Sequence, residues 1–152
     1  MDFVHIPVLL HEVLEGLAIR PDGIYVDGTV GGAGHSTEIA KRLTAGGKLI
    51  GFDRDPDAVE VATQRLAPYP ATVVHHNYDE MAEVLTEMGE VPVDGACFDA
   101  SRAQYLLPLE DVLRARNPHA AVVRFCREAF ARIAEQQRWN HLAWLTKPLI
   151  TQ

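Results

Sequence analysis

The sequence predicts an α/β fold in which helices flank a parallel β-sheet, and three observations support this prediction. Strand-like and helix-like segments alternate through residues 20–99, as in consecutive β-α-β units. A glycine-rich segment from Gly28 to Gly34 joins a strand-like run to a helix-like run. The chain has 152 residues, 47% of them apolar, so we expect one domain with a buried core and exclude a disordered chain.

The first predicted elements are a helix, a turn and a strand. An amphipathic helix is predicted where apolar side chains recur at i, i+3, i+4 and i+7, namely at Leu10, Val13, Leu14 and Leu17. Residues 21–23 are typical of a turn, and the β-favouring run 24–26 predicts the first strand. A second helix is predicted over 35–44, with Ile39 and Leu43 facing inward.

Three more strands and two more helices complete this region. The strands are predicted over 48–52, 71–74 and 93–98. One helix begins with Asp55 as its N-cap and Pro56 at its first position. The inner faces of the two helices are predicted to hold Val59, Ala62 and Leu66 in one, and Met81, Val84, Leu85 and Met88 in the other.

After Asp99 the alternation ends. A long, arginine-rich helix is predicted there, with an apolar face made of Val122, Cys126, Ala129, Phe130 and Ile133. Residues 142–145 are compatible with one last strand. We therefore expect residues 1–99 to form a ligand-binding α/β half, and residues 100–152 to form a helical, basic segment that packs on the same domain. The parallel sheet is then shorter than in a complete doubly wound fold.

Charge is unevenly distributed along the chain. The net charge is −7, with 17 acidic against 6 basic residues through Asp99, and 8 basic against 4 acidic residues after it. A basic tail of this kind could contact nucleic acid. Charge alone favours the alternative, a solvated face attracted to the acidic body. The arginines concerned are Arg114, Arg116, Arg124, Arg127, Arg132 and Arg138.

The segment after the first predicted strand is the strongest candidate for a binding site. Its glycines allow the backbone to turn sharply and to approach a ligand with no Cβ in between. Nineteen residues after Gly34, Asp53 ends the second strand, where a carboxylate can accept both hydroxyls of an adenosine ribose. The alternative is that the glycines form only a tight turn and that Asp53 only caps a helix.

The expected ligand is a nucleoside that lacks a pyrophosphate. No frame of this segment gives G-x-G-x-x-G, and the chain contains no G-x-x-x-x-G-K-[ST]. S-adenosylmethionine meets this restriction. Its methionine end would face Asp27 and the loop, and its ribose would bind Asp53. Tyr78 would lie against the adenine, and Asp99 would lie at the carboxyl edge of the sheet, where such folds bind ligands.

Four blocks of the sequence are collinear with the motifs of one known family. They are residues 5–13 with 21–29, 31–36, 51–56 and 93–99. Together they resemble the bacterial rRNA small-subunit methyltransferase H family, also called MraW. The resemblance implies a Rossmann-like, class I S-adenosylmethionine-dependent methyltransferase fold with a shortened sheet. It also implies an enzyme that methylates N4 of a cytidine in 16S rRNA.

The resemblance also implies which residues contact the cofactor. By position they are Ala33, Gly34, His35, Asp53, Tyr78, Asp99 and Gln104. Ala33 stands where the family usually has glycine, and a methyl group this close to the ligand requires a negative φ. Tyr78 stands where the family often has phenylalanine and keeps the stacking face. After Asp99 the family continues with Leu-Gly-Val-Ser-Ser-x-Gln, and Gln104 matches its glutamine across a short deletion. The family's inserted helical domain and further core strands have no match in the rest of this sequence.

Asp99 is the candidate catalytic residue for this reaction. Methyl transfer is an in-line displacement, so the protein mainly has to align donor and acceptor. A carboxylate that accepts an N4 proton would assist, and a backbone carbonyl of residues 100–101 is the alternative. The base must be unstacked to enter, and the expected partner is 16S rRNA of the small ribosomal subunit. Alternatively, the chain binds the cofactor without turnover, as a shortened paralogue or remnant acting as a binding or assembly module.

Other classes of function are not indicated by the sequence. The two cysteines, Cys97 and Cys126, and the seven histidines lack metal-ligand spacing, so we expect no metal. Ser36 and Ser101 lack the context of a nucleophile elbow. No apolar run approaches the roughly 20 residues that span a membrane, and no secretory signal is present, so we expect a cytoplasmic protein. An open sheet edge would favour a homodimer.

Overall fold

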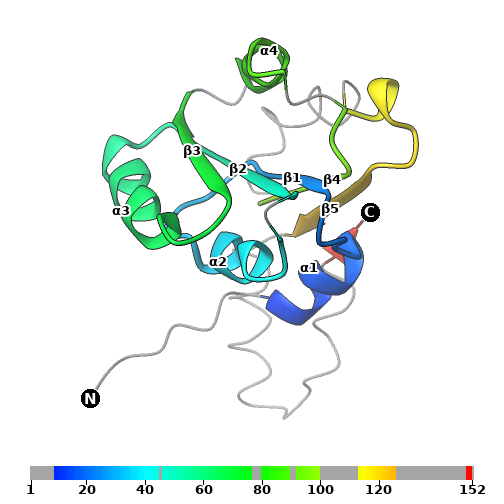
Figure 1. The fold of residues 1–152 in the computed structure, drawn as a ribbon, viewed down its shortest axis with the longest axis horizontal. Coiled ribbons are helices and arrows are strands. Elements are labelled where there is room, and N and C mark those ends of the chain that lie inside the picture. The colour runs from blue at the N-terminus through cyan, green and yellow to red at the C-terminus, as the bar shows by residue number, and fades with distance from the viewer. Residues whose placement is uncertain are drawn as a thin grey trace, which may run out of the picture.

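A six-stranded sheet forms the centre of the molecule in the computed structural model, with strand order β3-β2-β1-β4-β5-β6 (Figure 1). The structure describes residues 9–44, 46–76, 80–89, 92–99, 113–125 and 150–151. The strands are β1 (Ile24–Asp27), β2 (Lys48–Asp53), β3 (Ala71–His75), β4 (Gly95–Asp99), β5 (Ala121–Phe125) and β6 (Ile150–Thr151). The first five are mutually parallel, and β6 runs antiparallel to β5.

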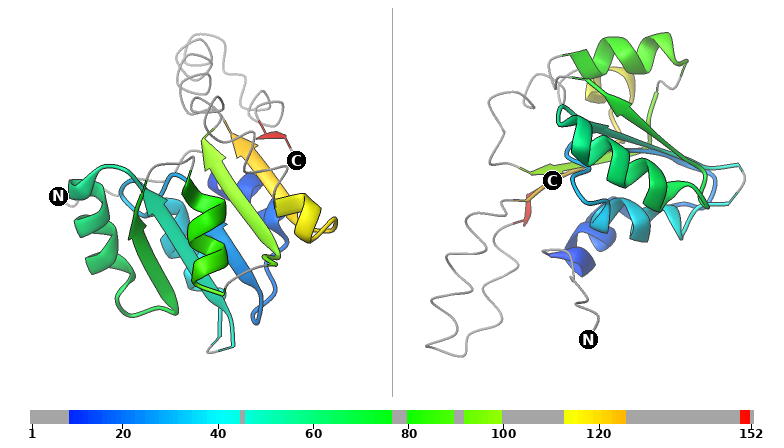
Figure 2. Two further views of the ribbon diagram at one scale, coloured as in Figure 1. Left: turned by 90° about the horizontal axis from the view of Figure 1, so that it is seen from above. Right: turned by 90° about the vertical axis from the view of Figure 1, so that its left-hand side faces the viewer.

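Helices cover both faces of the sheet (Figures 1 and 2). The labelled helices are α1 (Leu10–Leu17), α2 (Gly34–Ala40), α3 (Pro56–Leu66) and α4 (Met81–Glu87), and residues 113–116 form a further helical turn. Side chains of α1, α2 and α3 share one core cluster with Tyr25 and Leu49 of the strands. Side chains of α4 share a second cluster with the next residues along those strands, Val26 and Ile50. Successive strand residues are thus buried on opposite faces, as expected for a parallel sheet covered on both sides.

The strand order reverses beside β1, and this reversal determines where a ligand can bind. From β1 the chain moves outward through β2 to β3, then crosses back to place β4 on the other side of β1. The strand that follows β1 in sequence, β2, lies on one side of β1, whereas β4 and its successor β5 lie on the other side. In α/β sheets this arrangement opens a crevice at the carboxyl edge.

The elements predicted through Asp99 are confirmed, with small shifts at their ends. Asp55 caps α3 by accepting a hydrogen bond from the amide of Asp57 at 2.9 Å, and Pro56 follows it at the first helical position. The second helix ends at Ala40 instead of residue 44. Its last turn tightens, because the amide of Leu43 bonds to the carbonyl of Ala40, and the amide of Thr44 leaves to bond to Pro21 at 2.9 Å.

The helix predicted through Val122 is wrong for residues 121–125, which form strand β5. Val122 and Val123 are fully buried on opposite faces, and all five residues pair with β4. A short apolar run fits a buried strand and one helix face equally well, so periodicity could not distinguish them. The helical description of residues 100–152 is therefore corrected at β5 and β6. Cys126, Ala129, Phe130, Ile133 and the predicted strand 142–145 lie outside the described residues.

Candidate functional site

The ends of three strands meet at the carboxyl edge of the sheet. Asp27, the last residue of β1, lies opposite Gly51 of β2 and Cys97 of β4. Both neighbouring strands continue for two residues beyond these partners, to Asp53 and to Asp99. The segment that follows Asp27 therefore leaves the sheet between the ends of β2 and β4, where the sequence predicted a ligand.

This glycine-rich segment is bonded to both neighbouring strands. The amide of Gly28 donates to the carbonyl of Cys97 at 2.9 Å, and the amide of Val30 donates to that of Phe52 at 3.0 Å. The amide of Ala33 then closes a turn onto Val30 at 2.8 Å. Gly31 has a φ of +50°, a conformation that glycine adopts without a steric penalty. The loop is therefore built to a defined shape.

Asp53 organises this loop. Its side chain is buried, with 6% exposure. Its Oδ2 accepts the amide of Gly31 at 3.0 Å, and its Oδ1 accepts the amide of Asp55 at 3.0 Å. A carboxylate offers about four lone-pair positions, so both oxygens keep acceptor capacity for hydroxyl groups. Asp53 thus supports the backbone on both sides of the site, while the cap of α3 is Asp55, and its role in binding a ribose stays a prediction.

Asp27 and Ser36 form a second anchor of the loop. The sequence predicted that Asp27 faces the methionine end of the ligand, but it did not predict this pairing. The Oδ1 of Asp27 accepts the amide of Thr29 at 3.0 Å, and its Oδ2 accepts the hydroxyl of Ser36 at 2.7 Å. Both side chains are buried. Burial, reinforced by the Asp27 carboxylate, raises the pKa of the neighbouring Cys97 thiol well above its usual value. The sequence offered one signal for this pair: Asp27 ends a predicted strand, and Ser36 follows nine residues later in a predicted helix.

The expectation about Ala33 is wrong. It required a negative φ and a methyl group close to the ligand, whereas Ala33 has a φ of +66° and is fully buried in the core cluster of α1, α2 and α3. As the N-cap of α2 it makes no side-chain cap hydrogen bond. A small side chain tolerates this left-handed conformation at a modest cost, while the methyl group gains burial. Any contact of Ala33 with a ligand has to come from its backbone.

The structure describes some of the other predicted cofactor-binding residues and leaves others out. Gly34 is exposed at the start of α2. His35 is 5% exposed, and its ring lies 4.7 Å from that of Phe125 in β5, so this side chain fastens α2 to the sheet. The backbone of Asp99 ends β4, but its side chain lies outside what the structure describes. Tyr78 and Gln104 also lie outside the described residues.

The basic tail is only partly described. Arg114 and Arg116 are exposed, and Arg124 is half-buried on β5. Arg127, Arg132 and Arg138 lie outside the described residues. Within the described ranges, no cluster of three or more histidine, cysteine or carboxylate side chains could hold a metal ion, and no helix has the length and apolarity needed to cross a membrane.

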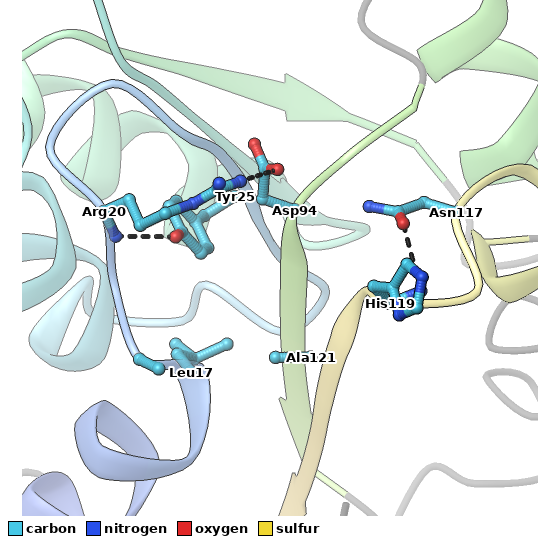
Figure 3. Close-up of a pocket in the computed structure, with 8 residues that line it drawn as sticks. Leu17, Arg20, Tyr25, Asp94, Asn117, His119 and Ala121 are labelled. Atoms are coloured by element: carbon cyan, nitrogen blue, oxygen red, sulfur yellow. Dashed lines mark hydrogen bonds and ion pairs between the residues drawn. The ribbon is translucent and has the colours of Figure 1, made fainter.

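A cavity of about 460 Å³ lies at the opposite, amino edge of the sheet (Figure 3). It is lined by Leu17, Ala18, Arg20, Tyr25, Asp94, Asn117, His119 and Ala121. Its polar groups bind one another. Arg20 forms an ion pair with Asp94 that raises the pKa of the guanidinium, and the Arg20 amide donates to the Tyr25 hydroxyl at 2.8 Å. These contacts tie the amino ends of β1 and β4 together, away from the glycine-rich loop.

Comparison with known proteins identifies the family of this chain. Residues 2–106, more than half of the 152, match the MraW methylase family. The chain belongs to the MraW methylase family. The match includes the glycine-rich loop, Asp53 and Asp99. Residues 80–145 also match a family of unknown function (DUF5996), which overlaps the end of the MraW match.

The MraW relatives are longer than this chain. The ribosomal RNA small subunit methyltransferase H of Lachnospira eligens is 53% identical over 109 residues, which is 70% of this chain and 35% of the relative. The protein of the same name from Clostridioides difficile is 44% identical over 113 residues, 73% of this chain and 36% of the relative. The chain therefore spans about a third of the length of these relatives.

Solved structures share the fold of this MraW-family chain. An rRNA methylase from Streptococcus thermophilus has a TM-score of 0.62 at 18% identity, over 88% of this chain and 81% of that protein. The O-methyltransferase TomG from Streptomyces achromogenes, solved in complex with SAM, has a TM-score of 0.61 at 22% identity, over 76% of this chain and 52% of that one. At these identities the likeness establishes the Rossmann-like methyltransferase fold alone.

Proposed function

We propose that this MraW-family chain binds S-adenosylmethionine at the carboxyl edge of its sheet and transfers the methyl group to N4 of a cytidine in small-subunit rRNA. The observation that carries the proposal is the buried Asp53 carboxylate, bonded to the amide of Gly31 in the glycine-rich loop. The names of the MraW relatives and the TomG complex with SAM support the reaction and the cofactor.

The residues present are compatible with this cofactor. Asp53 supplies anionic acceptors, which suit the two hydroxyls of a ribose. Gly32 and Gly34 are exposed, so the backbone of the loop is accessible where a ligand would pass. The loop has neither the glycine pattern nor the lysine that pyrophosphate recognition uses. The side chains of Ala33 and His35 are buried, so these residues would offer backbone contacts.

In this reaction some residues of the chain would bind the cofactor, and Asp99 would act on the amine of the substrate. S-adenosylmethionine, when bound, supplies an electrophilic methyl group on a sulfonium. Asp53 would hold the ribose, and the backbone of residues 31–35 would orient the methionine end, with Tyr78 against the adenine and Gln104 as a further contact. Asp99 would accept a proton from N4 and so increase the nucleophilicity of the amine. Alignment accounts for most of the expected acceleration.

A transfer assay tests this proposal. The folded chain is incubated with small-subunit rRNA and methyl-labelled S-adenosylmethionine, and the label is mapped after digestion to nucleosides. The proposal predicts label on N4 of one cytidine, and a loss of at least about a hundredfold in an Asp99→Ala variant if that carboxylate acts in proton transfer. Absence of label from cytidine would contradict the proposed reaction.

A second candidate function is cofactor binding without turnover. It is favoured by one observation: the MraW match ends at residue 106, and the chain continues with residues that match a different family. The region that matches the MraW relatives covers about a third of their length. S-adenosylhomocysteine binding together with an inactive transfer assay would distinguish this function from the first.

The proposed partner and location follow from the proposed reaction. The partner is 16S rRNA, contacted by the basic arginines after Asp99, and the location is the cytoplasm. We also propose a homodimer through the open edge of the sheet, where β3 pairs only with β2 in the strand order of the described residues. Light scattering after size exclusion would give twice the mass of 16.8 kDa for the dimer and the single mass if that proposal is wrong.

A further inference from the structure

The carbonyl of Gly32 lies just outside the hydrogen bonds of α2 and is bound by a side chain from another helix. Gly32 precedes Ala33, the N-cap of α2, and the amide of Thr37 bonds to the carbonyl of Ala33 at 2.9 Å. The hydrogen bonds within α2 therefore begin one residue too late to include Gly32. The Nη1 of Arg65, from the last turn of α3, donates to this carbonyl across 33 positions of sequence.

The Arg65 contact and the Asp53 contact hold neighbouring groups of the loop. Asp53, at the end of β2, binds the amide of Gly31. Arg65, on α3, binds the carbonyl of the next residue, Gly32. A Cβ at Gly32 would lie 3.3 Å from the Nη1 of Arg65, so the glycine allows the close approach. Two consecutive residues are thus held by an anion and a cation from two different elements.

The Arg65 contact constrains the peptide that leads into Ala33. Fixing the carbonyl of Gly32 fixes the orientation of the peptide plane between Gly32 and Ala33. The amide of that peptide bonds back to Val30 at 2.8 Å, and Ala33 takes its left-handed conformation directly after it. Without Arg65, the left-handed turn at Ala33 would lose one of the contacts that offset its cost.

We propose that Arg65 is a positioning residue for the cofactor loop: its guanidinium holds the Gly32 carbonyl, and so sets the affinity for S-adenosylmethionine without touching it. This inference rests on the proposed function, because it assumes that the loop binds the cofactor. Arg65 is exposed and lies in a helix end, where an arginine also interacts with the helix dipole. The interaction with the helix dipole does not need a particular partner, whereas the positioning role depends on the bond from Arg65 to the Gly32 carbonyl.

The test compares Arg65→Met with a matched control, Arg42→Met. Arg42 is also exposed and also donates to a backbone carbonyl, that of Glu38 at 2.7 Å, but within its own segment. Amide hydrogen exchange is measured without ligand, and S-adenosylhomocysteine affinity is measured by calorimetry. Arg65→Met is expected to exchange about tenfold faster at Gly31, Ala33 and Thr37 and to bind about tenfold more weakly, the effect of one charge-assisted hydrogen bond.

The outcomes separate this inference from the proposed function. Arg65→Lys keeps a charged donor and is expected to bind S-adenosylhomocysteine more tightly than Arg65→Met. If only the aliphatic stem of Arg65 mattered, the two variants would bind with similar affinity. Unchanged exchange at the loop in Arg65→Met, or equal effects in Arg42→Met, would overturn the inference. If the wild-type chain does not bind S-adenosylhomocysteine, the proposed function fails, and the exchange measurement still decides whether Arg65 positions the loop.

Discussion

Ala33 shows how a single residue can be constrained by two opposing demands. Its φ of +66° favours glycine, whereas its full burial favours a methyl group. The left-handed conformation costs an L-residue roughly 1–2 kcal/mol, and a buried methyl group contributes about 0.8 kcal/mol. Alanine is therefore a compromise at this position, and neither term was visible in the sequence motif.

The first prediction follows from this compromise. Ala33→Gly is expected to change the free energy of unfolding by less than about 1 kcal/mol, because relief of strain and loss of the methyl group offset each other. Ala33→Val is expected to lower it by more than about 2 kcal/mol, because a β-branched side chain is strained at positive φ and the site is full. Urea denaturation of the three proteins measures both. Equal stability of the valine variant would show that φ is not positive there.

Cys97 provides a prediction about pH. Burial and the Asp27 carboxylate raise the pKa of its thiol, so the folded chain retains this proton at a pH where the unfolded chain has lost it. The contribution of Cys97 to the free energy of unfolding is fully present below the pKa of its thiol in the unfolded chain, about 8.5. It is lost as the pH rises from there through the higher pKa of the thiol in the folded chain. Above pH 8.5 the wild type should lose up to about 1.4 kcal/mol per pH unit more than Cys97→Ala.

Urea denaturation at several pH values from 7 to 10 measures this difference. Both proteins share every other titrating group, so the difference between their slopes isolates Cys97. The substitution lowers stability at all pH values by removing the buried sulfur, and that offset does not affect the slope. Parallel pH profiles would contradict the account of the Cys97 environment.

The residues of the site could be predicted where they end strands, and not where they depend on long-range contacts. Asp53 was identifiable because a carboxylate follows a β-favouring run at a typical distance from the glycines. Its bond to Gly31, 22 positions away, and the bond of Arg65 to Gly32, 33 positions away, require the sheet and α3 to be assembled. Sequence spacing alone carries no signal for such pairs.

At the scale of elements, α3 offers the cleanest test of a local signal. Asp55→Ala removes the side-chain cap on the amide of Asp57 and is expected to cost about 1 kcal/mol of unfolding free energy. Glu60→Ala, also exposed and on the same helix, is the control and should change stability by less than about 0.5 kcal/mol. Equal effects of the two substitutions on the urea midpoint would contradict the capping role.

Helices with flanking signals were predicted well, and the last strands were not. The stripe from Leu10 to Leu17 and the Asp55-Pro56 cap mark α1 and α3 directly. Strand β5 carries no alternation, because Val122 and Val123 are both buried, on opposite faces of the sheet. Its assignment depends on pairing with β4, which is a tertiary property. Tertiary pairing also explains why the sheet has more strands than the local patterns predict.

At the scale of the whole molecule, the candidate binding residues lie together at the carboxyl edge of the sheet. The reversal of strand order beside β1 places the glycine-rich loop between the ends of β2 and β4. The residues at this edge lie within the region that matches the MraW methylase family, residues 2–106. The central proposal is therefore that the fold holds a nucleoside site in a chain whose matched region covers about a third of the length of these relatives.

The most direct test of this claim is calorimetric titration with S-adenosylhomocysteine of the wild type, Asp53→Ala and the exposed control Asp57→Ala. The account predicts saturable binding with one site per chain, unchanged by Asp57→Ala and at least about tenfold weaker in Asp53→Ala, which loses the carboxylate acceptor. Circular dichroism confirms that each protein is folded. A folded wild type that does not bind, or an Asp53→Ala variant that binds equally well, would contradict the account.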